Sequence, residues 1–297
     1  MPKLDATWRR SADNVGKFYD LGAERESSRL IRDPYHMVEL HVTLHYLAKH
    51  LPAVGHVLDI GGGSGRYCIA LARKGYTVTL ADVSTELLKI AEREFSKARV
   101  LGRIAGIAKA DARDLSIYAD ETFDAVLALG PIYHLVREKD RARAMDEIVR
   151  VARKGAPIFI SAISKFGVYR TLLISPEFEH EFTDSGIVKG LRKGISLARW
   201  YKESEAFPDA WFCTPRQLKE LAEAHDLQTL EMAACEGLSS HHREATNRLY
   251  RNKAAWKVWM DFVLKTSNEP SIIGSSEHFL YIGKKKAGGK TPHDARA

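Results

Sequence analysis

Residues 57 to 65 read Val-Leu-Asp-Ile-Gly-Gly-Gly-Ser-Gly, a short apolar run that ends in four glycines within five residues. An apolar run of this length, bounded by glycine, predicts a buried β-strand. Glycines directly after a strand let the chain turn sharply into a helix and let a ligand approach the backbone closely. The stretch therefore predicts a strand, a tight ligand-binding loop and a helix.

The residues around these glycines narrow the class of ligand. A dinucleotide fingerprint needs Gly-x-Gly-x-x-Gly, but counting from Gly61 the last position is Arg66. The pattern is instead Asp-x-Gly-x-Gly-x-Gly, with Asp59 ahead of the first glycine. A carboxylate there favours a ligand with a cationic group and disfavours a pyrophosphate. A tight turn that binds no ligand is the plain alternative.

Outward from the loop, apolar runs alternate with amphipathic segments. Strands are expected at 56–60, 77–81, 103–109, 125–129 and 157–162, and helices at 36–50, 64–74, 84–99 and 138–153. Strict alternation of this kind predicts a parallel sheet with helices on both faces. We therefore expect an α/β fold, Rossmann-like and doubly wound, with helical cap insertions.

The alternation breaks after Ser164 and returns at Thr214-Pro215, where threonine caps a helix and proline occupies its first turn. A strand near 228–235, an amphipathic helix over 242–265 and a strand at 278–282 follow. The expected divisions are an N-terminal helical lid (1–52), a ligand-binding α/β core (53–164), a helical and aromatic cap insertion (165–212), the rest of the core (213–283) with a helical insertion at 237–270, and a disordered basic tail (284–297).

Composition and charge favour a soluble cytoplasmic protein. The three cysteines are widely spaced and form neither a disulfide framework nor a zinc motif. We find no signal sequence and no apolar run that could span a bilayer, and expect no membrane partner. The net charge is +7, but from Lys284 onward five basic residues face one acid, so +4 belongs to the tail. The remaining charge makes a weak case for nucleic acid.

Over roughly residues 56–163 these motifs resemble the class I S-adenosylmethionine-dependent methyltransferases, in the small-molecule branch found in bacteria and archaea. The resemblance implies a mostly parallel seven-stranded sheet. In that family the loop, here Gly61, Gly63 and Gly65, wraps the methionine part of the cofactor. An acid after the second strand holds the ribose hydroxyls, which is the role implied for Asp82. A carboxylate suits that role because it accepts two hydrogen bonds at once.

The resemblance extends to the adenine site. An acid after the third strand reads the adenine amino group in the family, and Asp111 is the better match of the two acids in Asp111-Ala112-Arg113-Asp114. Asp82 could alternatively cap the helix that starts near Ser84. The cofactor-binding residues implied by the resemblance are Tyr19, Asp59, Gly61, Gly63, Gly65, Asp82, Val83, Asp111, Ala112, Leu129 and Gly130.

The fourth strand ends in Gly130-Pro131-Ile132-Tyr133-His134, which should border the transferred methyl group. His134 is a candidate base, because its ordinary pKa lies near neutrality, or else a residue of the pocket wall. Tyr133 is a candidate pocket residue. Enzymes that methylate nucleobase amino groups carry Asn or Asp-Pro-Pro-Tyr or Phe at this point, so Gly130 disfavours that class of substrate.

We therefore expect methyl transfer from S-adenosylmethionine to a small-molecule acceptor at oxygen, nitrogen or carbon, with S-adenosylhomocysteine as product. The basic tail and the segment 189–202 leave an RNA or protein methyltransferase open, and a non-catalytic cofactor-binding module is a further alternative. No metal is expected, because His41 and His45 lack the glutamate of a zinc-protease motif. The aromatic residues of 242–265 could form a homodimer interface instead of a cap.

Overall fold

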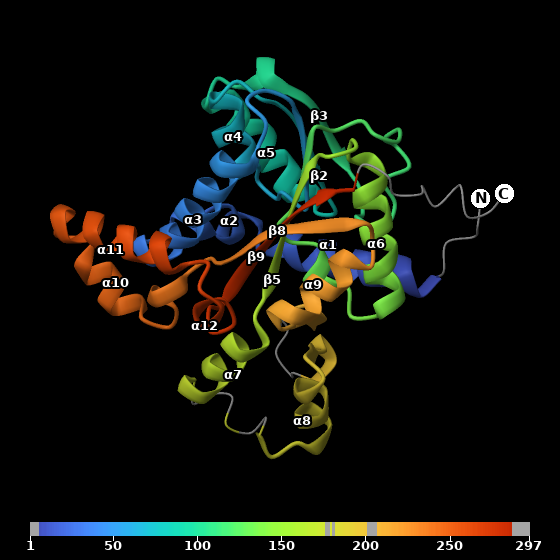
Figure 1. The fold of residues 1–297 in the computed structure, drawn as a ribbon. Coiled ribbons are helices and arrows are strands. Elements are labelled where there is room, and N and C mark those ends of the chain that lie inside the picture. The colour runs from blue at the N-terminus through green and yellow to red at the C-terminus, as the bar shows by residue number, and fades with distance from the viewer. Residues whose placement is uncertain (1–5, 176–178, 180–181, 201–206, 287–297) are drawn as a thin grey trace.

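The computed structural model describes residues 6–175, 179, 182–200 and 207–286, which form one sheet covered by helices on both faces (Figure 1). The strands of this sheet are β1 (His56–Ile60), β2 (Thr77–Asp82), β3 (Ile104–Lys109), β4 (Ala125–Ala128), β5 (Pro157–Ile163), β8 (Leu227–Ala234) and β9 (His278–Lys285). Their order is β3-β2-β1-β4-β5-β9-β8. Only β9 runs against its neighbours β5 and β8, so the prediction of a mostly parallel seven-stranded sheet is confirmed.

The helices follow the predicted alternation closely. They are α1 (Ala6–Leu21), α2 (Ala23–Ser27), α3 (Pro34–His50), α4 (Arg66–Arg73), α5 (Thr85–Lys97), α6 (Glu138–Val151), α7 (Lys165–Ile174), α8 (Ser185–Arg192), α9 (Pro215–Glu223), α10 (Arg243–Leu249), α11 (Lys253–Thr266) and α12 (Pro270–Ile273). Thr214 caps α9 through a capping box with Gln217, as the Thr-Pro pair predicts. Among the described residues, no helix has both the length and the apolar character needed to cross a membrane.

The core lies on both faces of the sheet. Leu58 and Ile60 of β1 point to one hydrophobic cluster, and Val57 points to the other. Residues two apart share a face of a strand, so a strand buried on both faces is apolar throughout. The chain order reverses between β1 and β4, where the following helices pass to opposite faces. This switch point is where such sheets bind ligands.

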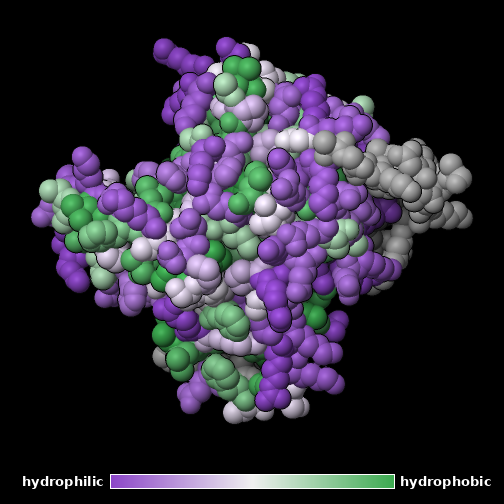
Figure 2. All heavy atoms as spheres, viewed as in Figure 1, coloured by the Kyte–Doolittle hydropathy of each residue, from purple (hydrophilic) through white to green (hydrophobic). Residues whose placement is uncertain are grey.

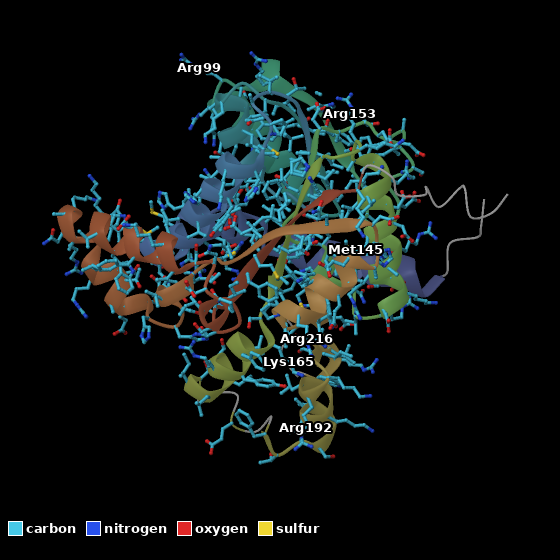
Figure 3. The ribbon with its side chains drawn as sticks, viewed as in Figure 1. Arg99, Met145, Arg153, Lys165, Arg192 and Arg216 are labelled. Carbon is cyan, nitrogen blue, oxygen red and sulfur yellow. The ribbon has the colours of Figure 1, made fainter. Side chains whose placement is uncertain are left out.

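Both insertions start at the carboxyl edge of the sheet. The first, with α7, α8 and the short β6–β7 pair (Ile195–Ser196 and Ala210–Trp211), follows the end of β5, and α10 and α11 follow the end of β8 (Figure 1). Lys165 donates to the backbone carbonyl of Arg192 and so joins the start of α7 to the end of α8 (Figure 3). Apolar side chains, Leu173 on α7 and Phe262 on α11 among them, lie on the surface of these insertions (Figure 2).

Two boundaries predicted from the sequence are wrong. The expected single helix over 242–265 is two helices, because the chain turns and Asn252 caps the start of α11 through hydrogen bonds from the next turn. The expected tail does not begin at residue 284, because β9 continues to Lys285. That lysine is buried and donates to the carbonyl of Ala152 at 2.9 Å. Residues 287–297 of the expected tail lie outside the described part of the chain.

Candidate functional site

The glycine loop after β1 requires glycine at each of its four positions. Gly61, Gly63 and Gly65 have φ angles of +72°, +56° and +74°, which side chains rarely adopt. A Cβ on Gly62 would lie 2.5 Å from Cγ of Asp59, and one on Gly65 would lie 2.4 Å from the Phe95 ring. The loop is therefore folded tightly over β1 and α5.

Asp59 lies beneath this loop and is fully buried. Its Oδ2 accepts a hydrogen bond from the Cys68 thiol at 3.3 Å, whereas its Oδ1 has no hydrogen-bond partner among the described residues. Burial raises the pKa of Asp59 to about 7. A buried carboxylate oxygen without a donor favours a cationic ligand nearby, because the ligand would offset the cost of desolvation.

Asp82 stands at the end of β2 and holds the glycine loop from the other side. Its two carboxylate oxygens accept hydrogen bonds from the backbone N–H of Gly63 at 2.9 Å and of Ser84 at 2.8 Å. Burial raises its pKa to about 6. The alternative role as a helix cap is wrong, because Ser84 caps α5 by accepting from the N–H of Leu87. Each Asp82 oxygen keeps a lone pair for a ligand hydroxyl.

Asp111 has a partner that sequence analysis missed. Its Oδ1 and Oδ2 accept from Nε and Nη2 of Arg113 at 3.0 and 2.7 Å, and Arg113 also pairs with Asp140 at 3.4 Å. Arg113 is only 1% exposed. In the sequence, only the Asp-x-Arg spacing of Asp111 and Arg113 could have indicated that these two side chains pair. A donor from a ligand would therefore share an Asp111 oxygen with this arginine.

These groups surround a cavity that is partly open to solvent, with about 1100 Å³ of empty space when its open mouth is included, which we call the switch-point pocket. Of the residues predicted from the sequence, those lining it are Tyr19, Asp59, Gly61, Gly63, Asp82, Val83, Asp111, Ala112, Leu129, Gly130, Tyr133 and His134. Gly65 is buried behind the pocket wall against Phe95. The tertiary fold thus brings twelve of the thirteen predicted residues to one cavity.

The cover of the pocket comes from the N-terminal segment. Ser11, Ala12 and Val15 of α1 line the cavity, as do residues of α2 and of the turn after it. We expected an N-terminal lid from residues 1–52 and a cap from the two insertions. Among the described residues, none from 165–212 or 237–270 lines the cavity. The expected lid over the cofactor site is therefore the part of the prediction that matches the geometry.

Helix α1 packs against the residues that connect β2 to α5. A Cβ on Gly16 would lie 3.2 Å from the backbone oxygen of Val83, so glycine permits this close approach. Oδ1 of Asp20 accepts from the Ser84 hydroxyl at 2.6 Å and from the N–H of Glu86 at 3.0 Å. An acid on the covering helix thus stabilises the first turn of α5.

Two arginines that sequence analysis did not single out also line the pocket. Arg29 donates to Glu39 at 2.6 Å and to Glu26 at 3.0 Å, so its charge is compensated. Arg66, the first residue of α4, donates to the carbonyl of Ser27 at 3.3 Å, but its buried Nε has no hydrogen-bond partner in the part of the chain that the structure describes. The pocket therefore offers an unsatisfied donor near the glycine loop as well as an unsatisfied acceptor.

His134 closes the short helix Ile132–His134 after β4 and is 5% exposed. Its Nε2 lies 2.9 Å from the hydroxyl of Tyr19, and its Nδ1 lies 3.3 Å from the backbone oxygen of Asp209. Burial lowers the pKa of His134 to about 4, although the contact with Asp209 opposes that shift. Burial raises the pKa of its neighbour Tyr133 to about 12. Both groups are therefore uncharged at neutral pH.

Several aromatic and ionisable residues outside the pocket lining have structural partners. Trp211 is buried with the guanidinium of Arg141 4.0 Å from its ring centre. A metal-like cluster brings ligand atoms of Glu39, Glu236 and His278 within 4.8 Å of one another. Each of the three already has a charged partner, since Glu39 binds Arg29 and Glu236 binds His278. The cluster is a buried network of ion pairs.

Known proteins are similar to this chain over its central region and in its fold. A family model described as a methyltransferase domain matches residues 58–160. The ubiquinone biosynthesis O-methyltransferase of Xylella fastidiosa (strain 9a5c) is 28% identical over 172 residues, which cover 55% of this chain. The match spans 65% of that relative, just under two thirds of its length.

Solved structures extend the similarity of fold over most of the chain. A methyltransferase from Methanosarcina mazei has a TM-score of 0.55 at 23% identity and covers 81% of this chain and 97% of its own. The 1,6-didemethyltoxoflavin-N1-methyltransferase of Burkholderia thailandensis, solved with S-adenosylhomocysteine, has a TM-score of 0.54 at 14% identity, covering 96% and 93%. At these identities the structures show the fold alone.

The sheet order and the switch-point pocket define a Rossmann-like α/β protein with its pocket at the carboxyl ends of β1, β2 and β4, where sheets of this kind usually bind ligands. Residues 58–160 match the methyltransferase-domain family model, so the resemblance of the sequence motifs to methyltransferases is confirmed over that region. S-adenosylmethionine is the cofactor of that family. The unpartnered oxygen of Asp59 and the unpartnered Nε of Arg66 fit the ammonium and carboxylate of its methionine part.

Proposed function

We propose that this chain transfers a methyl group from S-adenosylmethionine to a small-molecule acceptor, at oxygen, nitrogen or carbon, and releases S-adenosylhomocysteine. The observation that carries the proposal is the switch-point pocket, in which Asp82 and the glycine loop meet under the cover of α1. The names of the similar proteins support a small acceptor, since the Xylella relative is an O-methyltransferase of ubiquinone biosynthesis.

The charged residues and the glycine loop have separate tasks in this proposal. Asp82 accepts the ribose hydroxyls with the lone pairs that Gly63 and Ser84 leave free. Asp59 faces the ammonium group, Arg66 takes the carboxylate, and Asp111 accepts from the adenine amino group. The main-chain turn at Gly61 and Gly63 lets the methionine part lie against the backbone.

When bound, S-adenosylmethionine supplies a methyl group activated by attachment to a positively charged sulfur. The chain's own contribution is to orient the acceptor and to exclude water from the reacting groups. Leu129 and Gly130 border the expected position of the methyl group, and the hydroxyl of Tyr133 is held protonated by its raised pKa. Tyr133 can therefore donate a hydrogen bond to an acceptor oxygen or nitrogen.

The test is methyl transfer from labelled S-adenosylmethionine into a cell extract that is then separated by size. We expect label in the small-molecule fraction with wild-type protein and none with Asp82→Ala. Label found only in RNA or protein would instead favour a macromolecular acceptor. Tight cofactor binding without label in any fraction, across extracts from several sources, would contradict transfer and leave a cofactor-binding module.

A further inference from the structure

We infer that His134 is a positioning residue whose uncharged imidazole accepts a hydrogen bond from Tyr19 and thereby holds α1 closed over the switch-point pocket. The inference rests on the proposed function, because it concerns how the bound cofactor and product are retained. It assigns to His134 a task different from that of a base acting on the acceptor.

The hydrogen bonds of the imidazole define which nitrogen carries the proton. The backbone oxygen of Asp209 can only accept, so the Nδ1 that lies 3.3 Å from it must donate. In an uncharged ring the other nitrogen, Nε2, then holds the lone pair. The Tyr19 hydroxyl, 2.9 Å away, donates to that lone pair. The nitrogen that a base would use is therefore occupied.

Three separate segments of the chain meet at this ring. Tyr19 comes from α1, His134 from the loop after β4, and Asp209 from the end of the first insertion. The ring centre of Phe207 lies 5.3 Å from that of His134 and 6.0 Å from that of Phe18 on α1. The first insertion thus supports the lid by packing against α1 and by orienting the imidazole.

The carbonyl that orients His134 is itself held in place. Oδ1 of Asp209 accepts from the backbone N–H of Ala198 at 2.9 Å. This hydrogen bond fixes the position of Asp209 relative to Ala198. Burial leaves the ring uncharged at neutral pH, in keeping with its lowered pKa of about 4. A ring with that pKa is a weak base, and it is a suitable permanent acceptor for a tyrosine hydroxyl.

The bond lies on the part of α1 that controls access to the pocket. Ser11, Ala12 and Val15 line the cavity, so a shift of α1 would widen its opening to solvent. At the carboxyl end of the helix Asp20 remains tied to Ser84. The adjacent Tyr19–His134 and Asp20–Ser84 bonds therefore fix the carboxyl end of α1, and we expect the Tyr19–His134 bond to break when α1 moves away from the pocket during product release.

The experiment compares Tyr19→Phe, His134→Leu and His134→Gln in the full chain. We would measure the affinity for S-adenosylhomocysteine by calorimetry and the rate of trypsin cleavage after Lys17 with that ligand present; Lys17 is exposed on α1. One neutral hydrogen bond corresponds to about a 3- to 10-fold change in affinity. We expect that loss, with faster cleavage, in Tyr19→Phe and His134→Leu.

Two comparisons distinguish a His134 that holds the lid closed from a His134 that acts as a base. The double variant Tyr19→Phe/His134→Leu should bind no more weakly than Tyr19→Phe alone, because Tyr19→Phe already removes the bond to His134 together with the hydrogen bond between Tyr19 and Tyr133. His134→Gln should recover most of the affinity and most of the methyl transfer, since its amide can accept from Tyr19 but cannot act as a base. Tyr169→Phe, which removes a tyrosine bond to the carbonyl of Leu191 far from the pocket, is the matched control and should change neither readout.

The inference is overturned if Tyr19→Phe binds and is cleaved like the wild type. It is also overturned if His134→Gln and His134→Leu lose methyl transfer equally while affinity and cleavage stay unchanged, which is the behaviour of a base. Failure of the wild-type protein itself to bind S-adenosylhomocysteine would overturn the proposed function as well, and so is distinguished from failure of the lid contact alone.

Discussion

At the scale of single residues, three acids in one pocket have different surroundings. Asp59 has an oxygen without a partner, Asp82 accepts two backbone N–H groups, and Asp111 is paired with Arg113. Sequence spacing placed all three at the ends of strands, where ligands bind. Their hydrogen-bond partners differ because the end of each strand has different neighbours in the folded protein. The spacing of residues along the chain does not predict those neighbours.

Asp82 provides the sharpest test at this scale. We expect Asp82→Ala to weaken binding of S-adenosylhomocysteine at least roughly 100-fold, since hydrogen bonds to a charged group contribute about 1.5–3 kcal/mol each. Calorimetric titration measures this loss. Asp114→Ala is the matched control, because Asp114 accepts from the N–H of Ser116 and does not line the pocket. Equal affinity of the two variants would contradict the role of Asp82.

At the scale of elements, the glycine loop and α1 both line the pocket. The loop was predictable because four glycines in five residues can form few other structures. The position of α1 was predictable only as a family feature. Its position depends on the close approach of Gly16 to the backbone of Val83 and on the hydrogen bond from Ser84 to Asp20. Both contacts join segments that are far apart in the sequence.

Two glycines after core elements should differ in how much they matter to stability. A Cβ at Gly65 meets the Phe95 ring at 2.4 Å, whereas one at Gly75 has no atom within 4 Å, and both residues have positive φ. We expect Gly65→Ala to lower the free energy of unfolding by about 2–4 kcal/mol, from backbone strain and overpacking. Gly75→Ala should lower it by about 1–2 kcal/mol, from strain alone. Urea denaturation measures both, and equal losses would contradict the packing argument.

At the scale of the whole molecule, a buried chain of charges joins the N-terminal and C-terminal parts. Arg29 binds Glu39 on α3, and His278 at the start of β9 binds Glu236 just after β8. Although burial alone would lower it, the charges of Glu236 and Glu39 raise the pKa of His278 to about 9. The protonated ring therefore contributes to the stability of the fold.

This network predicts a pH dependence of stability. The pKa of His278 is higher in the folded protein than its ordinary value of about 6.5, so its contribution is complete below about pH 6.5 and declines as the pH rises through about 9. We expect the difference in unfolding free energy between the wild type and His278→Gln to shrink over that range. Urea denaturation at pH 6, 7.5 and 9 tests this. A difference that stays constant or grows would show that the ring is not charged in the folded state.

The sequence by itself determined the order of strands and helices, the glycine loop and the acids that follow the strands. These features depend on spacing along the chain, because strand and helix periods and turn residues are local properties. Only the tertiary structure decided that Arg113 pairs with Asp111, that α1 rather than the insertions covers the pocket, and that Tyr19 reaches His134, 115 positions away. Such contacts join segments that become neighbours only when the sheet and its two cores have packed, and so no local pattern specifies them.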